Sequence, residues 1–210
     1  MSLSRRRFLP LVFSALLLGA SGCGADEPRQ QPVPTAPAKG EAPNPRVLIE
    51  TNKGKIVVEL FPRLAPRSVE NFLGYVDSGY YNNTVFHRVI PGFMAQGGGF
   101  GTDLRKKPTN EPIPNEADNK LRNLRGTLAM ARTNDPDSAT AQFFINVVDN
   151  YMLDHRGKTP AGWGYAVFGQ VVEGMEVADA LVAVPRGNLA GMQDVPRQPL
   201  VMTKVSRLPQ

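Results

Sequence analysis

Short apolar runs separated by turn residues recur from residue 46 to the C-terminus, and they constrain the fold of this chain more than any other feature. Each run has the length of a strand, and glycine, proline or asparagine stands between most of them. We expect strands at residues 47–50, 55–60, 86–90, 93–96, 126–131, 142–148, 165–172 and 200–205. Many short strands of this kind are typical of an antiparallel barrel or sandwich, and the pattern alone does not choose between the two.

Helical spacing occurs in two segments of this region. Between Pro66 and Gly79, apolar residues recur three and four positions apart, the proline suits a first helical turn and the glycine suits a helix end. Residues 174–184 show the same spacing. Residues 97–125 are rich in glycine, proline and charged residues. They show neither the alternation of a strand nor the spacing of a helix, so we expect a long loop there. The folded part is therefore predicted to be mainly β.

The N-terminus resembles an export signal. Three arginines at residues 5–7 precede an apolar run at residues 8–19, which is shorter than the roughly 20 residues that a membrane-spanning helix needs. Residues 4–9 also resemble a twin-arginine signal, which implies export of a prefolded protein. An ordinary Sec signal with one extra arginine explains the same residues equally well.

Residues 18–23 resemble a bacterial lipobox, in which cleavage occurs before a cysteine that is then acylated. Small residues precede Cys23, although Ala20 stands where leucine is more usual. The alternative is a plain signal peptide followed by an unmodified thiol. We expect residues 1–22 to be the signal peptide and Cys23 to be the lipid anchor, which places the protein in the bacterial cell envelope, facing the periplasm.

Residues 23–45 are expected to be a disordered tether between this anchor and the domain at residues 46–210. Six prolines stand there among alanine, glutamine, glutamate and lysine, so the segment has little to bury. At roughly 3 Å per residue, it spans up to about 65 Å.

Charge and cysteine content exclude several function classes. The net charge of +5 falls to about +2 without the arginines at residues 5–7, which is too little to indicate nucleic-acid binding. Cys23 is the only cysteine, so no intramolecular disulfide forms. His87 and His155 have no neighbouring ligand cluster in the sequence, so we expect structural, hydrogen-bonded histidines and no metal or other cofactor.

Residues 86–98 carry the clearest chemical signal. Strand alternation puts Phe86, Arg88 and Ile90 on one face and His87 and Val89 on the other. A guanidinium keeps its charge and offers donors in a planar fork, so it suits a reaction that needs hydrogen bonds and no proton transfer. The alternative is a surface arginine that forms an ion pair, which the apolar flanks make less favourable.

This stretch, together with three later blocks in matching order, resembles the cyclophilin family of peptidyl-prolyl isomerases, from about residue 46 to the C-terminus. The resemblance implies a closed eight-stranded antiparallel barrel with a helix over each open end and a substrate groove on the outside of the barrel. The matching blocks are residues 86–98, 130–132, 141–146 and 165–169.

The resemblance also implies the activity. Rotation about an Xaa-Pro bond has a barrier of about 20 kcal/mol because the amide is conjugated. A catalyst needs only to bind the twisted amide better than the planar forms. Arg88 matches the family's catalytic arginine, which hydrogen-bonds the prolyl segment. The residues that match its proline pocket and substrate contacts are Phe93, Met94, Gln96, Ala131, Arg132, Gln142, Phe144, Leu153 and Tyr165.

Two features depart from the drug-binding eukaryotic members of the family. Met152 matches a further substrate-binding position of the groove, where those members carry tryptophan, and methionine has no indole N–H donor. We therefore expect weak cyclosporin binding. Residues 156–163 form a longer connection than is usual, and the sequence does not say what it selects.

We expect a lipid-anchored, monomeric, cofactor-independent isomerase that acts on proline-containing segments of other exported proteins. One alternative from a different class is a non-catalytic chaperone or peptide-binding lipoprotein that uses the same groove. A passive envelope lipoprotein is disfavoured because Arg88, Phe93, Gln96 and Phe144 are all present.

Overall fold

The computed structural model describes residues 42–209. The predicted signal peptide, Cys23 and most of the predicted tether lie outside the described residues. Contacts with the domain begin slightly before residue 46, because the Pro45 carbonyl accepts a hydrogen bond from the Leu60 amide at 2.9 Å. Among residues 42–209, no helix combines the length and the hydrophobicity that crossing a membrane requires.

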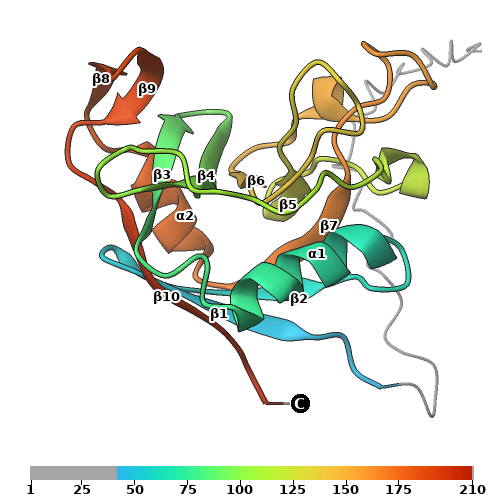
Figure 1. The fold of residues 1–210 in the computed structure, drawn as a ribbon, viewed down its shortest axis with the longest axis horizontal. Coiled ribbons are helices and arrows are strands. Elements are labelled where there is room, and N and C mark those ends of the chain that lie inside the picture. The colour runs from blue at the N-terminus through green and yellow to red at the C-terminus, as the bar shows by residue number, and fades with distance from the viewer. Residues whose placement is uncertain (1–41, 210) are drawn as a thin grey trace, which may run out of the picture. The chain divides into compact units, whose positions relative to one another are not determined.

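Eight strands form a closed barrel in which every hydrogen-bonded pair is antiparallel, so the expected closed antiparallel barrel is confirmed (Figure 1). Around the barrel the order is β1-β10-β3-β4-β6-β5-β7-β2. Closure pairs the barrel strands on both sides, which leaves no long edge exposed. The strands are β1 (Arg46–Thr51), β2 (Gly54–Leu60), β3 (Thr84–Ile90), β4 (Met94–Gly101), β5 (Thr127–Met130), β6 (Phe143–Asn146), β7 (Val167–Glu173) and β10 (Val201–Arg207).

Both predicted helices are present, as α1 (Pro66–Asp77) and α2 (Met175–Val182). Helix α1 packs against β7 and β10, and α2 packs against β2, β3 and β4. Their apolar faces join the interior core of the barrel, where the ring of Phe72 lies 5.2–5.3 Å from three other aromatic rings. Helix α1 ends just before Gly79, whose φ of +68° suits glycine.

Two features of the fold differ from the sequence-based expectation. A separate hairpin of β8 (Arg186–Leu189) and β9 (Met192–Pro196) was not predicted, because its residues have no apolar alternation. Strand β4 also runs to Gly101, into the predicted loop. Its glycines allow close packing: a Cβ on Gly97 would lie 2.9 Å from the Phe86 ring. Two short 3-10 turns, η1 (Ala117–Asn119) and η2 (Tyr151–Leu153), lie in the connections.

A bulge in β3 breaks the alternation that the sequence suggests. Phe86 and Val89 both lie in the interior core, whereas Arg88 lines a pocket that the interior core does not include. The register of β3 against β4 shifts between Phe86 and Arg88, so one extra residue is accommodated there. The prediction that Phe86 and Arg88 share a face is therefore wrong, and the bulge is what turns Arg88 outward.

Candidate active site

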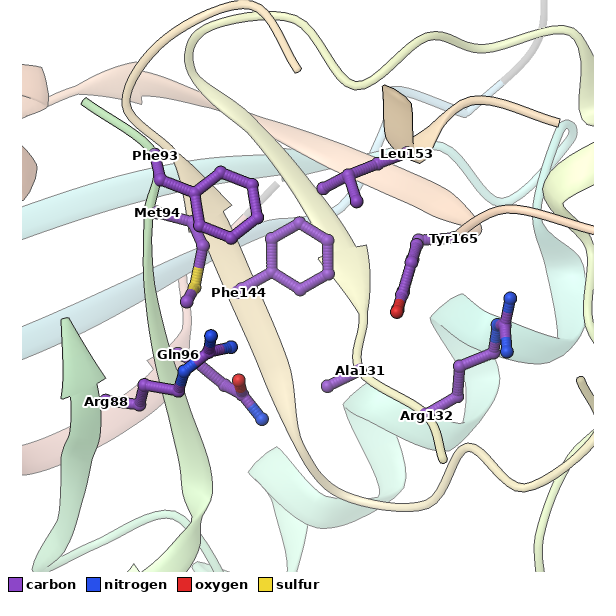
Figure 2. A pocket seen from close by; sticks show the side chains of 9 residues that line it. All are labelled: Arg88, Phe93, Met94, Gln96, Ala131, Arg132, Phe144, Leu153 and Tyr165. Carbon is purple, nitrogen blue, oxygen red and sulfur yellow. The ribbon is translucent and has the colours of Figure 1, made fainter. Parts of the chain in front are cut away.

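Nine of the eleven residues predicted from the sequence to act at the site line one pocket with a cavity of about 110 Å³. Such a cavity is far larger than the ~10–15 Å³ that a single water molecule needs. Figure 2 shows their side chains arranged around this cavity. The lining residues are Arg88, Phe93, Met94, Gln96, Ala131, Arg132, Phe144, Leu153 and Tyr165.

Strand alternation places the apolar part of this lining on the outside of the barrel. In β4, Ala95 faces the interior core while Met94 belongs to a second apolar cluster, and in β6 the same holds for Ile145 and Phe144. Phe93, Leu153 and Tyr165 pack against this second cluster from the connecting segments. Hydrophobic residues that the pattern alone would assign to the interior therefore form the floor and walls of an external pocket.

Arg88 is the only residue of formal charge on the β3–β4 side of the pocket lining. It lies opposite Gln96 in the β3–β4 ladder, and Figure 2 shows the two side chains next to each other at the cavity. Within residues 42–209, its guanidinium has no ion-pair or hydrogen-bond partner, which disagrees with the alternative of a surface ion-pairing arginine. Its donors are therefore free for a ligand.

Gln142 does not line the pocket but holds a residue that does. The Gln96 Nε2 atom donates a hydrogen bond of 3.0 Å to Gln142 Oε1. Gly99 makes this possible, because a Cβ at that position would lie only 2.5 Å from Gln142 Cγ. Gln142 thus acts on the pocket through Gln96, which it orients beside Arg88.

Arg132 uses its side chain within the protein. Its guanidinium donates to the carbonyls of Gly164 and Thr133 at 2.9 Å each, and its Cζ lies 4.7 Å from the centre of the Tyr165 ring. Its main-chain amide and carbonyl have no hydrogen-bond partner in the described part of the chain. The main chain of Arg132 is thus free to bind a substrate backbone, while its side chain fixes one wall of the pocket.

A buried network of three asparagines supports the same walls, and sequence analysis missed it. Asn146 Nδ2 donates to Asn123 Oδ1 at 3.3 Å, and Asn150 Nδ2 donates to Asn146 Oδ1 at 2.7 Å. All three are at most 2% exposed. Side-chain amides of this network also donate to the carbonyls of three pocket residues: Phe93 (3.0 Å), Leu153 (3.1 Å) and Tyr165 (3.3 Å).

The pocket lining contains no carboxylate, thiol or imidazole. It combines an apolar floor with a fixed cation and an oriented amide, so it suits hydrogen bonding to an amide that neither breaks nor gains a covalent bond. Residues 46–207 match the model of the family described as cyclophilin type peptidyl-prolyl cis-trans isomerase/CLD. The chain belongs to the cyclophilin family.

Curated relatives agree with this assignment. Peptidyl-prolyl cis-trans isomerase cyp18 of Streptomyces antibioticus is 61% identical over 156 residues, which are 74% of this chain and 94% of the relative. Peptidyl-prolyl cis-trans isomerase B of Escherichia coli (strain K12) is 54% identical over 160 residues, which are 76% of this chain and 98% of the relative. The predicted enzyme class is confirmed: this cyclophilin is a peptidyl-prolyl cis-trans isomerase of a family that binds proline-containing peptides.

Solved structures agree with the fold. A crystal structure of a cyclophilin type peptidyl-prolyl cis-trans isomerase from Cryptosporidium parvum matches with a TM-score of 0.65 and 28% identity, over 80% of this chain and 99% of that chain. A second crystal structure of that protein, in the presence of the dipeptide Ala-Pro, matches with a TM-score of 0.64 and 28% identity, over 79% and 99% of the two chains.

Met152 does not line the pocket of this cyclophilin. It lies in η2 beside Leu153, which does, and it is 62% exposed. The predicted contact of Met152 with substrate thus has no counterpart in the pocket lining. Its exposure instead places it at the surface next to the pocket.

Neither histidine of this cyclophilin lines the pocket. The His87 ring packs against Phe100 at a tilt of 48° with ring centres 4.5 Å apart, and its Nδ1 lacks a hydrogen-bond partner among residues 42–209. Burial, and secondly the charge of Arg88, lower the pKa of His87 to about 4, although the backbone of Val85 opposes this shift. His87 is thus a buried neutral residue, but the predicted hydrogen bond is not made by its Nδ1.

His155 does make the predicted kind of structural contact, because its Nδ1 lies 2.8 Å from the carbonyl oxygen of Trp163. Within residues 42–209, no group of three or more histidine, cysteine, aspartate or glutamate side chains is arranged to hold a metal ion. The absence of a cofactor stays a prediction from the sequence.

Proposed function

We propose that this cyclophilin isomerises Xaa-Pro bonds of exported polypeptides in the bacterial cell envelope, where acylated Cys23 holds it at a membrane. The catalytic half of the proposal rests on the unpaired guanidinium of Arg88 beside an apolar pocket. The location rests on the signal-like arginines and apolar run, the lipobox-like residues before Cys23 and the proline-rich segment that follows.

In the proposed mechanism, the proline ring occupies the apolar floor formed by Met94, Phe144 and the side chains around them. Arg88 donates hydrogen bonds to the prolyl segment and favours the twisted amide, in which the nitrogen has lost its conjugation. Gln96, oriented by Gln142, and the main chain of Arg132 hold the substrate backbone. No proton or covalent bond is exchanged with the protein.

An isomerisation assay on a proline peptide tests the role of Arg88. We expect Arg88→Ala to lower kcat/KM by roughly 100-fold, the effect of removing one donor that acts mainly in the transition state. Because Arg88 has no partner among the described residues, its loss should leave Tm unchanged. Arg105→Ala is the matched control, since that side chain is 89% exposed and lies outside the pocket.

Full activity of Arg88→Ala would show that the assignment of Arg88 is wrong. The same pair of proteins distinguishes the non-catalytic alternative. A module that only holds proline segments would bind the peptide without accelerating its isomerisation, in the wild type and in the variant alike.

Mass spectrometry of the mature N-terminus tests the proposed location. We expect the chain to begin at Cys23 with acyl chains attached, because several chains on one residue anchor a protein stably whereas a single chain does so only marginally. Cys23→Ser should release the protein into the soluble fraction. An unacylated wild-type chain that begins at another residue would overturn the lipoprotein proposal.

The proposed oligomeric state is a monomer. It is supported by the closed barrel, whose strands are paired on both sides and offer no long edge to a second copy. Sedimentation equilibrium of the domain measures this directly.

A further inference from the structure

A second, larger hollow of about 470 Å³ lies on the other side of the η2 turn from the proline pocket. The two share this turn as a wall, because Leu153 lines the proline pocket while Tyr151 and Asp154 line the hollow. Figure 2 shows Leu153 at the edge of the proline pocket, between Phe93 and Tyr165. We call this second site the basic hollow; its lining residues are Ala117, Asp118, Lys120, Leu121, Arg122, Tyr151, Asp154, His155 and Arg156.

The two carboxylates of the basic hollow are already paired. Asp154 accepts hydrogen bonds from the Arg122 Nε atom at 3.1 Å and from the Asn123 amide at 2.7 Å. Asp118 forms an ion pair with Lys158 at 3.1 Å. Their negative charge is therefore largely compensated by neighbouring cations and donors.

Two cations of the basic hollow lack such compensation. Within residues 42–209, neither Lys120 nor Arg156 forms an ion pair with a carboxylate. Both residues are exposed, so they are accessible to a ligand. The hollow thus has an excess of positive charge that would attract an acidic group.

Arg156 is held close to the proline pocket. Its Nη2 atom donates a 2.9 Å hydrogen bond to the carbonyl of Met152, and its amide donates to the Gly162 carbonyl at 2.8 Å. The guanidinium therefore lies directly behind the turn that separates the two sites. Since a guanidinium has five N–H donors, most of them are available to bind a carboxylate.

We propose that the basic hollow is a subsite for an acidic side chain of the polypeptide substrate, an aspartate or glutamate close to the isomerised proline. The proposal rests on the proposed function, because it assumes that a polypeptide occupies the proline pocket. A chain that leaves this pocket over Leu153 crosses the exposed Met152 and reaches the hollow. Because a single turn separates the two sites, we expect the acidic residue within a few residues of the proline.

Paired peptides test this preference directly. Each pair has one central proline and differs only by glutamate or glutamine, placed in turn two, three or four residues before or after the proline. We expect kcat/KM to be about three- to five-fold higher for glutamate than for glutamine on one side of the proline, which is the range of one exposed ion pair. The preference should decrease as the salt concentration rises.

Two double variants distinguish an effect of the basic hollow on this preference from an effect of the overall charge of the domain. Lys120→Gln with Arg156→Gln should bring the glutamate-to-glutamine ratio close to one. Lys53→Gln with Lys204→Gln removes the same charge from exposed positions at the β1–β2 turn and in β10, which line neither site, and should leave the ratio unchanged.

The outcomes distinguish failure of this inference from failure of the proposed function. If no peptide is isomerised, the proposed function itself is wrong. If glutamate and glutamine peptides are isomerised equally well, the function stands and the acidic subsite is overturned. A preference that survives loss of Lys120 and Arg156, or that falls equally in the control variant, also overturns it.

Discussion

Two neighbouring residues of β3, His87 and Arg88, lie in different environments. Arg88 faces the proline pocket, whereas His87 is 6% exposed and packs against the Phe100 ring. The charge of Arg88 still acts on its neighbour, since it adds to burial in lowering the pKa of His87 to about 4. The charge of Arg88 therefore also affects how the stability of the domain depends on pH, because it acts on the pKa of His87.

The pKa of His87 predicts a loss of stability in acid. The unfolded chain binds a proton at His87 below its ordinary pKa of about 6.5, but the native protein does so only below about 4. The stabilisation from neutral His87 is therefore complete above pH 6.5 and is lost as the pH falls towards 4. By pH 4.5 this loss should reach about 2 to 3 kcal/mol.

Urea unfolding of the wild type and His87→Phe at pH 7 and pH 4.5 measures this effect. The variant should lose less stability than the wild type over this range, because phenylalanine fills the site without titrating. Between pH 8 and 9, where His87 is neutral in both states, the two proteins should change in parallel. Equal losses in acid would show that His87 does not cause the pH dependence.

Met152 predicts the response to cyclosporin. Its exposed thioether beside the pocket cannot supply the N–H donor that tryptophan provides in the drug-binding relatives that the sequence resembles. We expect cyclosporin to bind the domain weakly and Met152→Trp to increase the affinity at least about ten-fold, or about 1.4 kcal/mol. Calorimetric titration of both proteins checks this, and nanomolar binding by the wild type would contradict it.

At the scale of elements, three apolar residues of the pocket come from connections rather than from strands. Phe93 follows β3, Leu153 ends η2 and Tyr165 precedes β7, so none of them is held by the barrel ladder. The asparagine network takes over that role by binding their carbonyls. Buried amides suit this task because each one both donates and accepts hydrogen bonds.

Asn150→Ala tests whether the network positions the pocket. The change removes the donors to Asn146 Oδ1 and to the Phe93 carbonyl, so it should destabilise the domain by about 1–3 kcal/mol. It should also raise KM more than it lowers kcat, since the wall rather than Arg88 is displaced. Denaturant unfolding and steady-state kinetics give the two readouts.

Asn52→Ala is the matched control for this prediction. Asn52 also makes two side-chain hydrogen bonds: it donates to the Pro199 carbonyl at 2.9 Å and accepts from the Val201 amide at 3.1 Å, but it is exposed and does not line the pocket. This variant should change stability by less than about 0.5 kcal/mol and leave KM unaltered. Destabilisation by Asn150→Ala without any change in KM would mean that the network is structural only.

At the scale of the molecule, all residues of the interior core and of the pocket lining belong to the described domain. The interior core runs from Val47 to Val205, and all nine pocket residues lie between Arg88 and Tyr165. We therefore expect the domain to fold and to act without the segment before residue 42.

A protein of residues 42–210 tests this independence. We expect its Tm to equal that of the longer chain and its kcat/KM on a short peptide to agree within about two-fold, because no pocket or core residue is removed. Calorimetry and the isomerisation assay measure both. A large loss of activity in the shorter protein would place part of the site in the N-terminal segment.

The sequence by itself determined the eight barrel strands, both helices, the family and nine of the residues that gather at the pocket. It could do so because alternation and helical spacing are local, and because the matching blocks contain the pocket residues. The tertiary structure alone decided the bulge that turns Arg88 outward, the asparagine network and the pairing that leaves Lys120 and Arg156 uncompensated. These features depend on contacts between segments that are distant in the sequence, which form only when the barrel closes. A local sequence pattern does not predict such contacts.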